Sequence, residues 1–181
     1  MPTLTTRRLS LRLVRASDAE AIFIAYASNA SVTKFLTWRP HLSPVTVKKD
    51  IQRFMLKSYR EGECFPWVIT GRKDNRIMGM IDLKLSQKDG QKHAAEIGYV
   101  LAEPEWGKGY MTEALGEVLN FALTELKLKR IAAYCDLANK ASAKVMMKAG
   151  MKREGTMHRY IVHPNIAPTP RDCFCFAIWK T

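Results

Sequence analysis

The sequence predicts a mixed α/β fold, with a central, mainly antiparallel mixed sheet of about seven strands flanked by helices on both faces. Segments of strand and helix periodicity follow one another as strand, two or three helices, three strands, helix, strand, helix and two strands. The 181 residues, 47% hydrophobic and 25% charged, are typical of a globular chain with a substantial core. We therefore expect a single domain over residues 1–181.

The N-terminal third is predicted to be one strand followed by helices. Residues 9–13 alternate leucine with polar side chains, as a half-buried strand does. Ser17, with Glu20 three residues later, predicts a capping box that opens a helix ending near residue 27. A helical turn is expected over residues 31–36.

A longer helix is predicted from Pro44 to Gly62, since proline is tolerated in a first turn and glycine closes helices. Its apolar stripe consists of Val47, Ile51, Phe54, Met55 and Tyr59. Residues 65–70 and 77–85 then read as a hairpin, and residues 93–101 as a strand that places Glu96 on the face opposite Ile97 and Tyr99.

The C-terminal part alternates helices and strands. Apolar residues at helical spacing predict a helix over residues 110–126, and Gly150 ends a second helix over residues 139–149. Strands are expected at residues 130–135, 152–161 and 172–179, with an irregular loop at residues 163–170.

Cysteine usage and the N-terminus indicate a cytoplasmic protein. The four cysteines show no Cys-x-x-Cys or zinc-finger spacing, so we interpret them as reduced core residues and expect no metal site. Cys173 and Cys175, on one face of a strand, are the alternative metal ligands. The N-terminal residues lack the apolar segment of a signal peptide, and no apolar run reaches membrane-spanning length.

The formal net charge of +12 narrows the class of partner. A positive field favours polyanions: nucleic acid, a ribonucleoprotein surface, or a small ligand with several phosphates. It disfavours free polycations as substrates.

A glycine turn is the first candidate binding site. Gly107-Lys108-Gly109 lies between a strand and an amphipathic helix, where free amides and the positive helix end can bind a phosphate. The third glycine of a dinucleotide fingerprint and the Gly-Lys-Ser/Thr of a P-loop are both missing. Taken alone, the turn could equally be an ordinary helix entry.

Three blocks in the same order as a known family make the match specific. They are Ala95-Glu96-Ile97-Gly98-Tyr99, then Glu105-Trp106-Gly107-Lys108-Gly109-Tyr110-Met111-Thr112-Glu113-Ala114, then Asn139-Lys140-Ala141-Ser142 ahead of Lys148-Ala149-Gly150-Met151. With these blocks the chain resembles the GNAT superfamily, and within it the RimJ/RimL-like branch of ribosomal-protein N-acetyltransferases. The likeness extends from Arg7 to Trp179.

The resemblance implies acetyl-coenzyme A as cofactor and assigns residues to it. Pantetheine would insert between two splayed strands against the backbone near Tyr99, Val100 and Leu101. The diphosphate would be held at the turn made of Trp106, Gly107, Lys108, Gly109, Tyr110, Met111 and Thr112. Asn139 would hydrogen-bond the pantetheine arm, and Ser142 would lie near the thioester sulfur.

The chain departs from the family pattern at three positions. Trp106 fills the first slot of the turn motif and Met111 the last, where a small residue is usual, so we expect methionine bulk beside the phosphates. Met146 stands where many relatives carry the tyrosine that protonates the leaving thiolate. That role passes to Ser142 or to a water molecule, although the Ser142 hydroxyl could instead contact a helix carbonyl.

Acetyl transfer to an amine requires a proton acceptor, because a protonated amine cannot attack the thioester. Glu96 is the first candidate base, since its strand leads to the expected thioester; the alternative is a structural carboxylate held by the backbone or an arginine. His93, Asp136 and His158 are weaker candidates. The backbone amides of Tyr99 or Val100 could polarise the carbonyl.

The resemblance places the acceptor near Trp38, Arg39 and Tyr160, although aromatic residues near helix ends are often core residues. Asp172 could meet a cationic N-terminus, or pair with Arg171 or Arg159.

The leading hypothesis is direct acetyl transfer from acetyl-CoA to a protein N-terminal α-amine, possibly on a ribosomal protein. A small amine acceptor (amino acid, polyamine or aminoglycoside) is the second. A basic RNA-binding module without catalysis is the third, and it is weakened by the dispersion of the basic residues along the chain. We expect nucleic acid contact only through proximity to the ribosome, and a monomer or homodimer.

Overall fold

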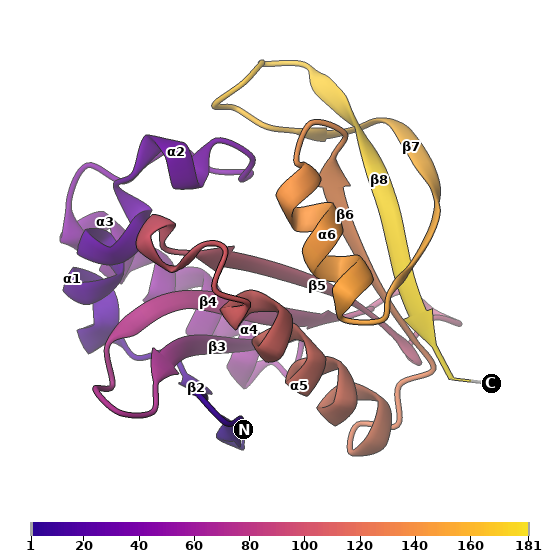
Figure 1. Ribbon diagram of the computed structural model, residues 1–181, viewed down its shortest axis with the longest axis horizontal. Coiled ribbons are helices and arrows are strands. Elements are labelled where there is room, and N and C mark those ends of the chain that lie inside the picture. Colours follow the sequence, from indigo (N-terminus) through magenta and orange to yellow (C-terminus); the bar gives the residue numbers. More distant parts are fainter. Residues whose placement is uncertain (1, 181) are drawn as a thin grey trace.

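The computed structural model describes residues 2–180 and is built on one eight-stranded sheet (Figure 1). This confirms the predicted mixed fold; the short N-terminal strand β1 brings the strand number to eight. In spatial order the strands are β1 (Leu4–Thr5), β2 (Leu9–Leu13), β3 (Cys64–Gly71), β4 (Ile77–Leu85), β5 (Ala94–Leu101), β6 (Arg130–Asp136), β8 (Pro170–Trp179) and β7 (Lys152–Val162).

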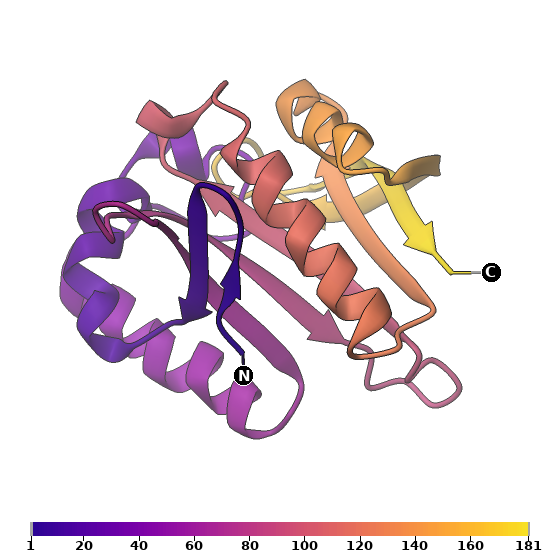
Figure 2. The ribbon, with the colours of Figure 1, turned by 60° about the horizontal axis from the view of Figure 1, so that its bottom comes forward.

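Helices cover both faces of the sheet, each burying its own core (Figure 2). One face carries the helices that precede β3: α1 (Ala19–Ile22), α2 (Ala30–Thr33), α3 (Pro44–Asp50) and α4 (Leu56–Arg60). The other face carries α5 (Tyr110–Thr124) and α6 (Lys140–Lys148). Leu115 and Val118 of α5 are fully buried against this face, and Ile51 and Val68 are fully buried on the opposite one.

The pairing of β5 with β6 positions the site. It is the parallel pairing in an otherwise antiparallel sheet, and it spans only Ala94↔Arg130, Ala95↔Ile131 and Glu96↔Ala132. Both strands continue beyond these pairs, β5 to Leu101 and β6 to Asp136, so they separate into a wedge (Figure 1). On its other edge β5 stays paired with β4 up to Leu101, which leaves the wedge-facing backbone of residues 97–101 without a strand partner.

The alternation predicted for β5 is confirmed. Ile97 is buried and Tyr99 packs in the core under α5, whereas Val100 packs against the helices of the opposite face. Glu96 projects to that opposite face and is exposed. The strand therefore separates its carboxylate from its apolar neighbours.

Two helical details differ from the prediction. Ser17 is exposed and does not cap the first helix; the Asp18 carboxylate accepts a hydrogen bond from the Arg15 backbone at 2.7 Å and binds the Arg12 guanidinium at 2.8 Å. The helical region therefore begins two residues earlier than predicted, with Arg15 as the N-cap residue and Asp18 at the third helical position. The charge-assisted contacts of Asp18 are stronger than a neutral serine cap, which explains the shift.

Phe54 is 58% exposed, although the predicted stripe placed it in the core. Residues Ile51–Met55 form a π-helical segment between α3 and α4. A π-turn holds an extra residue and so rotates the following side chains away from the 3.6-residue stripe. Gly62 ends this helical region in the left-handed conformation, as predicted.

Candidate functional site

The turn before α5 presents a row of free amides. Gly107 and Gly109 have φ values of 74° and 78°, a left-handed conformation that side chains other than glycine rarely adopt. Among residues 2–180, no acceptor takes a hydrogen bond from the backbone N–H groups of residues 107–112. Six neighbouring donors at a helix N-terminus are a chemical match for a diphosphate.

The side chains around this turn leave the amides uncovered. The Trp106 indole is 47% exposed and donates to the Leu101 carbonyl at 2.8 Å, and Lys108 Nζ pairs with Glu105 at 3.2 Å. Met111 is only 4% exposed and packs in the core beneath α5. The expectation that Met111 adds bulk beside the phosphates was therefore wrong, because its position on the helix points it inward.

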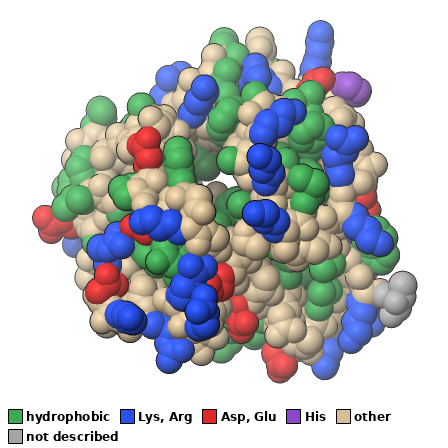
Figure 3. Space-filling view, viewed as in Figure 1, with side chains coloured by type: hydrophobic (Ala, Val, Ile, Leu, Met, Phe, Trp, Pro, Cys, Tyr) green, Lys and Arg blue, Asp and Glu red, His purple; other side chains and the backbone are tan. Residues whose placement is uncertain are grey.

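The opening of the wedge lies beside this turn. Figure 3 shows the α5 and α6 face hollowed between the α2 region and α6, with Lys and Arg side chains on the surface around the hollow. Tyr99, Val100 and Leu101 line the wedge through the unpaired edge of β5. An extended chain with amide groups can pair with such an edge as a strand would.

Asn139, Ser142 and Tyr99 meet on the β6 side of the wedge. Asn139 Oδ1 accepts from the Ser142 backbone at 3.1 Å and caps α6, while no residue of the described chain binds its Nδ2. The Ser142 Oγ lies 2.8 Å from the Tyr99 hydroxyl, which also lies 3.2 Å from the Ser142 carbonyl. Burial raises the pKa of Tyr99, so its hydroxyl stays protonated as a hydrogen-bond donor.

Cys135 lies next to Ser142, a proximity that the sequence did not reveal. Its thiol is buried, which raises its pKa to about 12, with the Cys173 thiol adding to the effect. A thiol in this state is a poor nucleophile. Met146, in contrast, is fully buried in the core and contributes no polar group to the wedge.

Glu96 stands at the closed end of the wedge on the opposite face. Within the described chain it forms no hydrogen bond or short ion pair. The alternative that Glu96 is a structural carboxylate held by the backbone or by an arginine is therefore not supported. Although the residue is exposed, the groove walls partly desolvate its carboxyl group, and this desolvation raises the pKa; Lys84 opposes the shift and Asp82 adds to it. Lys84 is the cross-strand partner of Glu96 and lies 3.3 Å from Asp82.

A groove of about 530 Å³ extends from Glu96 over this face. Its walls include Lys84, Ala132, Tyr134 and Tyr160. The rings of Tyr134 and Tyr160 contact each other at a tilt of 49°, with their centroids 4.7 Å apart. The sequence did not identify Tyr134 as a site residue. The pattern of a short strand does not show that this side chain faces Glu96 across the wedge.

The predicted acceptor residues fall into two groups. Tyr160, 41% exposed, lines the groove with Glu96. Trp38 is half-buried against the helices, with its ring 5.3 Å from that of His41, and Arg39 is exposed. Asn165 connects the two regions, since its Nδ2 donates to the carbonyls of Thr33 at 2.7 Å and Trp38 at 2.8 Å.

The weaker candidate bases have different surroundings. His93 lines the groove near its outer end. Asp136 is fully buried and bound by Arg171 at 2.5 Å, which leaves it no free acceptor role. His158 is largely exposed and pairs with Asp172 at 2.9 Å; Asp172 also accepts from the Arg159 backbone.

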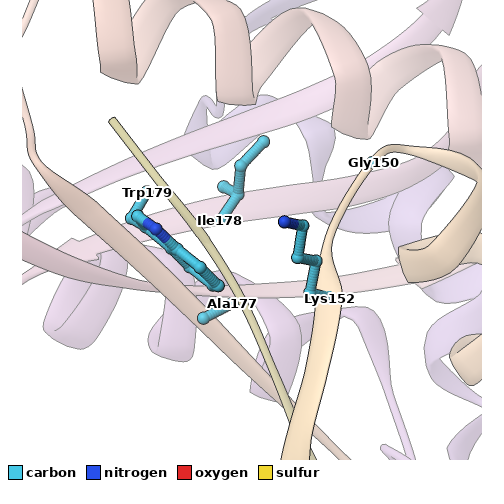
Figure 4. Close-up of a pocket in the computed structure, with 5 residues that line it drawn as sticks. All are labelled: Gly150, Lys152, Ala177, Ile178 and Trp179. Carbon is cyan, nitrogen blue, oxygen red and sulfur yellow. The ribbon is translucent and has the colours of Figure 1, made fainter. Parts of the chain in front are cut away.

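Two further features bear on binding. Among residues 2–180, no cluster of three His, Cys, Asp or Glu side chains could hold a metal ion, and no helix is long and apolar enough to cross a membrane. A second, smaller hollow of about 160 Å³ lies between Lys152 and Trp179, where the lysine covers the indole (Figure 4).

Comparison with known proteins agrees with this geometry. The model of the acetyltransferase (GNAT) domain matches residues 8–152, which include Glu96, the amide turn and Ser142. The uncharacterized N-acetyltransferase YoaA of Bacillus subtilis is 32% identical over 180 residues, 99% of this chain and 97% of the relative. The [ribosomal protein uS5]-alanine N-acetyltransferase of Escherichia coli is 27% identical over 88% of this chain and 82% of its own length.

Among solved structures, Mycobacterium smegmatis RimJ in complex with CoA-disulfide superposes with a TM-score of 0.83 at 26% identity, covering 98% of this chain and 86% of that one. The free amide turn, the wedge and these matches together show that the chain belongs to the GNAT family and is an acetyl-CoA-dependent N-acetyltransferase.

Proposed function

We propose that the protein acetylates the N-terminal α-amine of a protein, with a ribosomal protein as the leading acceptor. The observation that carries this proposal is the groove of about 530 Å³, whose walls bring Glu96 together with Tyr134 and Tyr160. A residue occupies on the order of 100 Å³ at protein packing density, so the groove has room for several residues of an extended N-terminus. The resemblance to the uS5-alanine N-acetyltransferase supports the same acceptor class.

The residues present fit acetyl-CoA in three places. The amides of residues 107–112, with the side chains of Trp106, Lys108 and Tyr110 around them, would hold the diphosphate. The open edge of β5 at Tyr99, Val100 and Leu101 would pair with pantetheine, and Asn139 Nδ2 is free to donate to it. Acetyl-CoA supplies an activated acetyl thioester, which the acceptor amine attacks directly.

Glu96 is proposed as the general base. Its carboxylate forms no hydrogen bond within residues 2–180, and it lines the groove in which the amine would lie. A raised pKa makes it a better proton acceptor near neutral pH than an ordinary glutamate. Backbone amides at Tyr99 or Val100 would polarise the reacting carbonyl.

Ser142 is proposed as the proton donor to the departing thiolate. Its hydroxyl is held by the Tyr99 hydroxyl, 2.8 Å away, so that the two can pass a proton between them. The thiol has a pKa of about 8.5, so the help needed from this donor is modest. Trp38, Arg39 and Tyr160 are proposed to hold the acceptor chain at the groove and at the bridge that Asn165 forms.

An acceptor panel tests the proposal. Purified protein is incubated with acetyl-CoA and with N-terminal peptides of ribosomal proteins, free amino acids, spermidine and an aminoglycoside, and products are identified by mass spectrometry. We expect acetylation at the α-amine of peptides, with a blocked N-terminus unmodified. A larger kcat/KM for spermidine or the aminoglycoside than for any peptide would contradict it.

A further inference from the structure

The N-terminal strand pair reaches across to the cofactor turn. The carboxylate of Glu113, in the first turn of α5, accepts hydrogen bonds from Thr6 Oγ1 at 2.5 Å, Arg8 N at 2.9 Å and Arg8 Nε at 2.6 Å. These contacts join residues about a hundred positions apart in the sequence, and Figure 2 shows the N-terminal strands beside α5. They lie at the helix end, where a carboxylate is favoured by the helix dipole.

The Arg8 guanidinium continues from Glu113 into the turn itself. Its Nη1 donates to the Lys108 carbonyl at 3.0 Å, and its Cζ lies 4.4 Å above the centre of the Tyr110 ring. Its Nη2 has no partner in the described chain and lies 3.5 Å from where a Cβ on Gly109 would stand. One planar group thus contacts Lys108 and Tyr110 and lies beside Gly109, the residue between them.

The contact with Lys108 fixes the orientation of a neighbouring amide. A peptide unit is planar and trans, so the Lys108 carbonyl and the Gly109 N–H point in opposite directions. When Arg8 holds the carbonyl on one side, the Gly109 N–H is directed to the other. Gly109, with its left-handed φ, forms one side of this peptide unit and would otherwise leave the unit free to rotate.

We propose that Arg8 is a positioning residue of the cofactor site, which holds the turn so that its amides converge on the diphosphate of coenzyme A. The inference rests on the proposed assignment of this turn to the diphosphate. Because Glu113 already neutralises the Arg8 charge, the effect is one of geometry. Lysine at position 8 keeps the charge but lacks the planar fork that contacts Glu113, Lys108 and the Tyr110 ring together.

The test compares Arg8→Lys and Arg8→Gln with Arg7→Gln, a matched control because Arg7 is exposed and forms no hydrogen bond or ion pair within residues 2–180. Calorimetric titration measures the affinity of each variant for coenzyme A, for dephospho-coenzyme A and for pantetheine, which lacks the diphosphate. We expect both Arg8 variants to bind coenzyme A and dephospho-coenzyme A about tenfold more weakly, because one hydrogen-bond donor to the charged diphosphate loses its orientation. Their affinity for pantetheine should equal that of the wild type. Arg7→Gln should bind all three as the wild type does.

A kinetic readout separates positioning from general destabilisation. KM for acetyl-CoA should rise about tenfold in Arg8→Lys, while kcat/KM with S-acetylpantetheine as donor stays at the wild-type value. Wild-type affinity for coenzyme A in Arg8→Lys would overturn the proposal, as would an equal loss for pantetheine. If the wild-type protein bound coenzyme A no better than pantetheine, the assignment of the turn to the diphosphate would fall as well.

Discussion

Among the acidic residues on the groove side of the central strands, Glu96 forms no hydrogen bond or close ion pair within residues 2–180 and has Lys84 as its cross-strand neighbour, whereas Asp82 is paired with Lys84 and Asp136 with Arg171. Substitution of Glu96 breaks no hydrogen bond of the fold, so its effect reports mainly on catalysis. Burial raises the pKa of Glu96, and protonation abolishes its function as a base. The rate should therefore fall as the pH drops through this raised pKa.

Glu96→Gln should lower kcat/KM about a hundredfold near neutral pH, since a positioned general base contributes 10²–10⁴-fold. The difference in kcat/KM between Glu96→Gln and the wild type should become smaller at high pH, where the acceptor amine is already neutral. A pH–rate profile measures both effects, with the exposed Glu20→Gln as control. The same loss at every pH would rule out Glu96 as the base.

Ser142→Ala should lower kcat about tenfold and leave the melting temperature unchanged, because a thiolate leaving group needs only modest protonation. The Tyr99 hydroxyl keeps the Ser142 carbonyl as an acceptor after this change, so no buried group loses its partner. Steady-state kinetics and thermal unfolding check the two parts. A kcat equal to that of the wild type would show that water, and not Ser142, protonates the leaving thiolate.

The residue-scale interactions that the sequence could not show are those between distant segments. Glu96, Ser142 and the glycine turn stand in local motifs and could be predicted as site residues from them. Tyr134, Asn165 and Arg8 carry no local signal, since their roles arise from partners brought close only by the sheet order. For Asp172 the sequence allowed several partners; in the structure its carboxylate binds the Arg159 backbone N–H and His158.

At the scale of elements, the entry of α5 is the part whose backbone is most constrained by function. Gly109 adopts φ 78° as the residue before α5. Gly109→Ala should weaken coenzyme A binding about tenfold, because a left-handed alanine costs about 1–2 kcal/mol and the turn can relax only by moving its amides.

Gly116→Ala is the matched control within the same helix. A Cβ at Gly116 would meet nothing within 4 Å, and alanine in a helix interior is favoured over glycine by about 1 kcal/mol. This variant should melt at a higher temperature and bind coenzyme A normally. Unchanged affinity in Gly109→Ala, measured by calorimetry, would contradict the importance of the turn geometry.

Strands β6 and β8 are joined by the ion pair of Asp136 and Arg171. Burial alone would raise the pKa of Asp136, but the hydrogen bonds from Arg171 and the Ala138 backbone outweigh it and hold the pKa below its usual value. A lowered folded-state pKa stabilises the fold above the unfolded pKa of about 4, and this contribution is lost as the pH falls through the folded value.

Arg171→Met should therefore reduce the free energy of unfolding at pH 7, and by less than for a fully buried pair because the Arg171 side chain is 34% exposed. The difference from the wild type should shrink below pH 4, as Asp136 becomes protonated. Urea unfolding at pH 7 and below pH 4 measures this difference in the free energy of unfolding, with Arg60→Met at an exposed position as control. A difference that grows in acid would contradict the assigned direction of the pKa shift.

Strands and long helices were predictable because their periodicity is local, as the leucines of β2 and the buried face of α5 show. The π-helical segments within the first helices were not, since the extra residue is accommodated by packing on the sheet. The extent of β5 and β6 was also visible in the sequence. That they share only three pairs was expected from the family resemblance and not from their residues.

For the molecule as a whole, the separation of two parallel strands creates two connected surfaces with different chemistry. One face offers free amides and an unpaired strand edge, and the other offers an unpartnered carboxylate in a groove. A donor bound on one side and an amine bound on the other would meet at the wedge. The position of the diphosphate determines where the acetyl group must lie, so the proposed mechanism depends on the assignment of the turn to the diphosphate.

Amide chemical shifts test that claim most directly. In a ¹H–¹⁵N correlation spectrum of the labelled protein titrated with coenzyme A, the amides of residues 107–112 should show the largest shifts. The same amides should respond to 3′,5′-ADP with weaker affinity and remain unmoved by pantetheine. Saturable binding of coenzyme A that leaves these six amides unshifted would contradict the account.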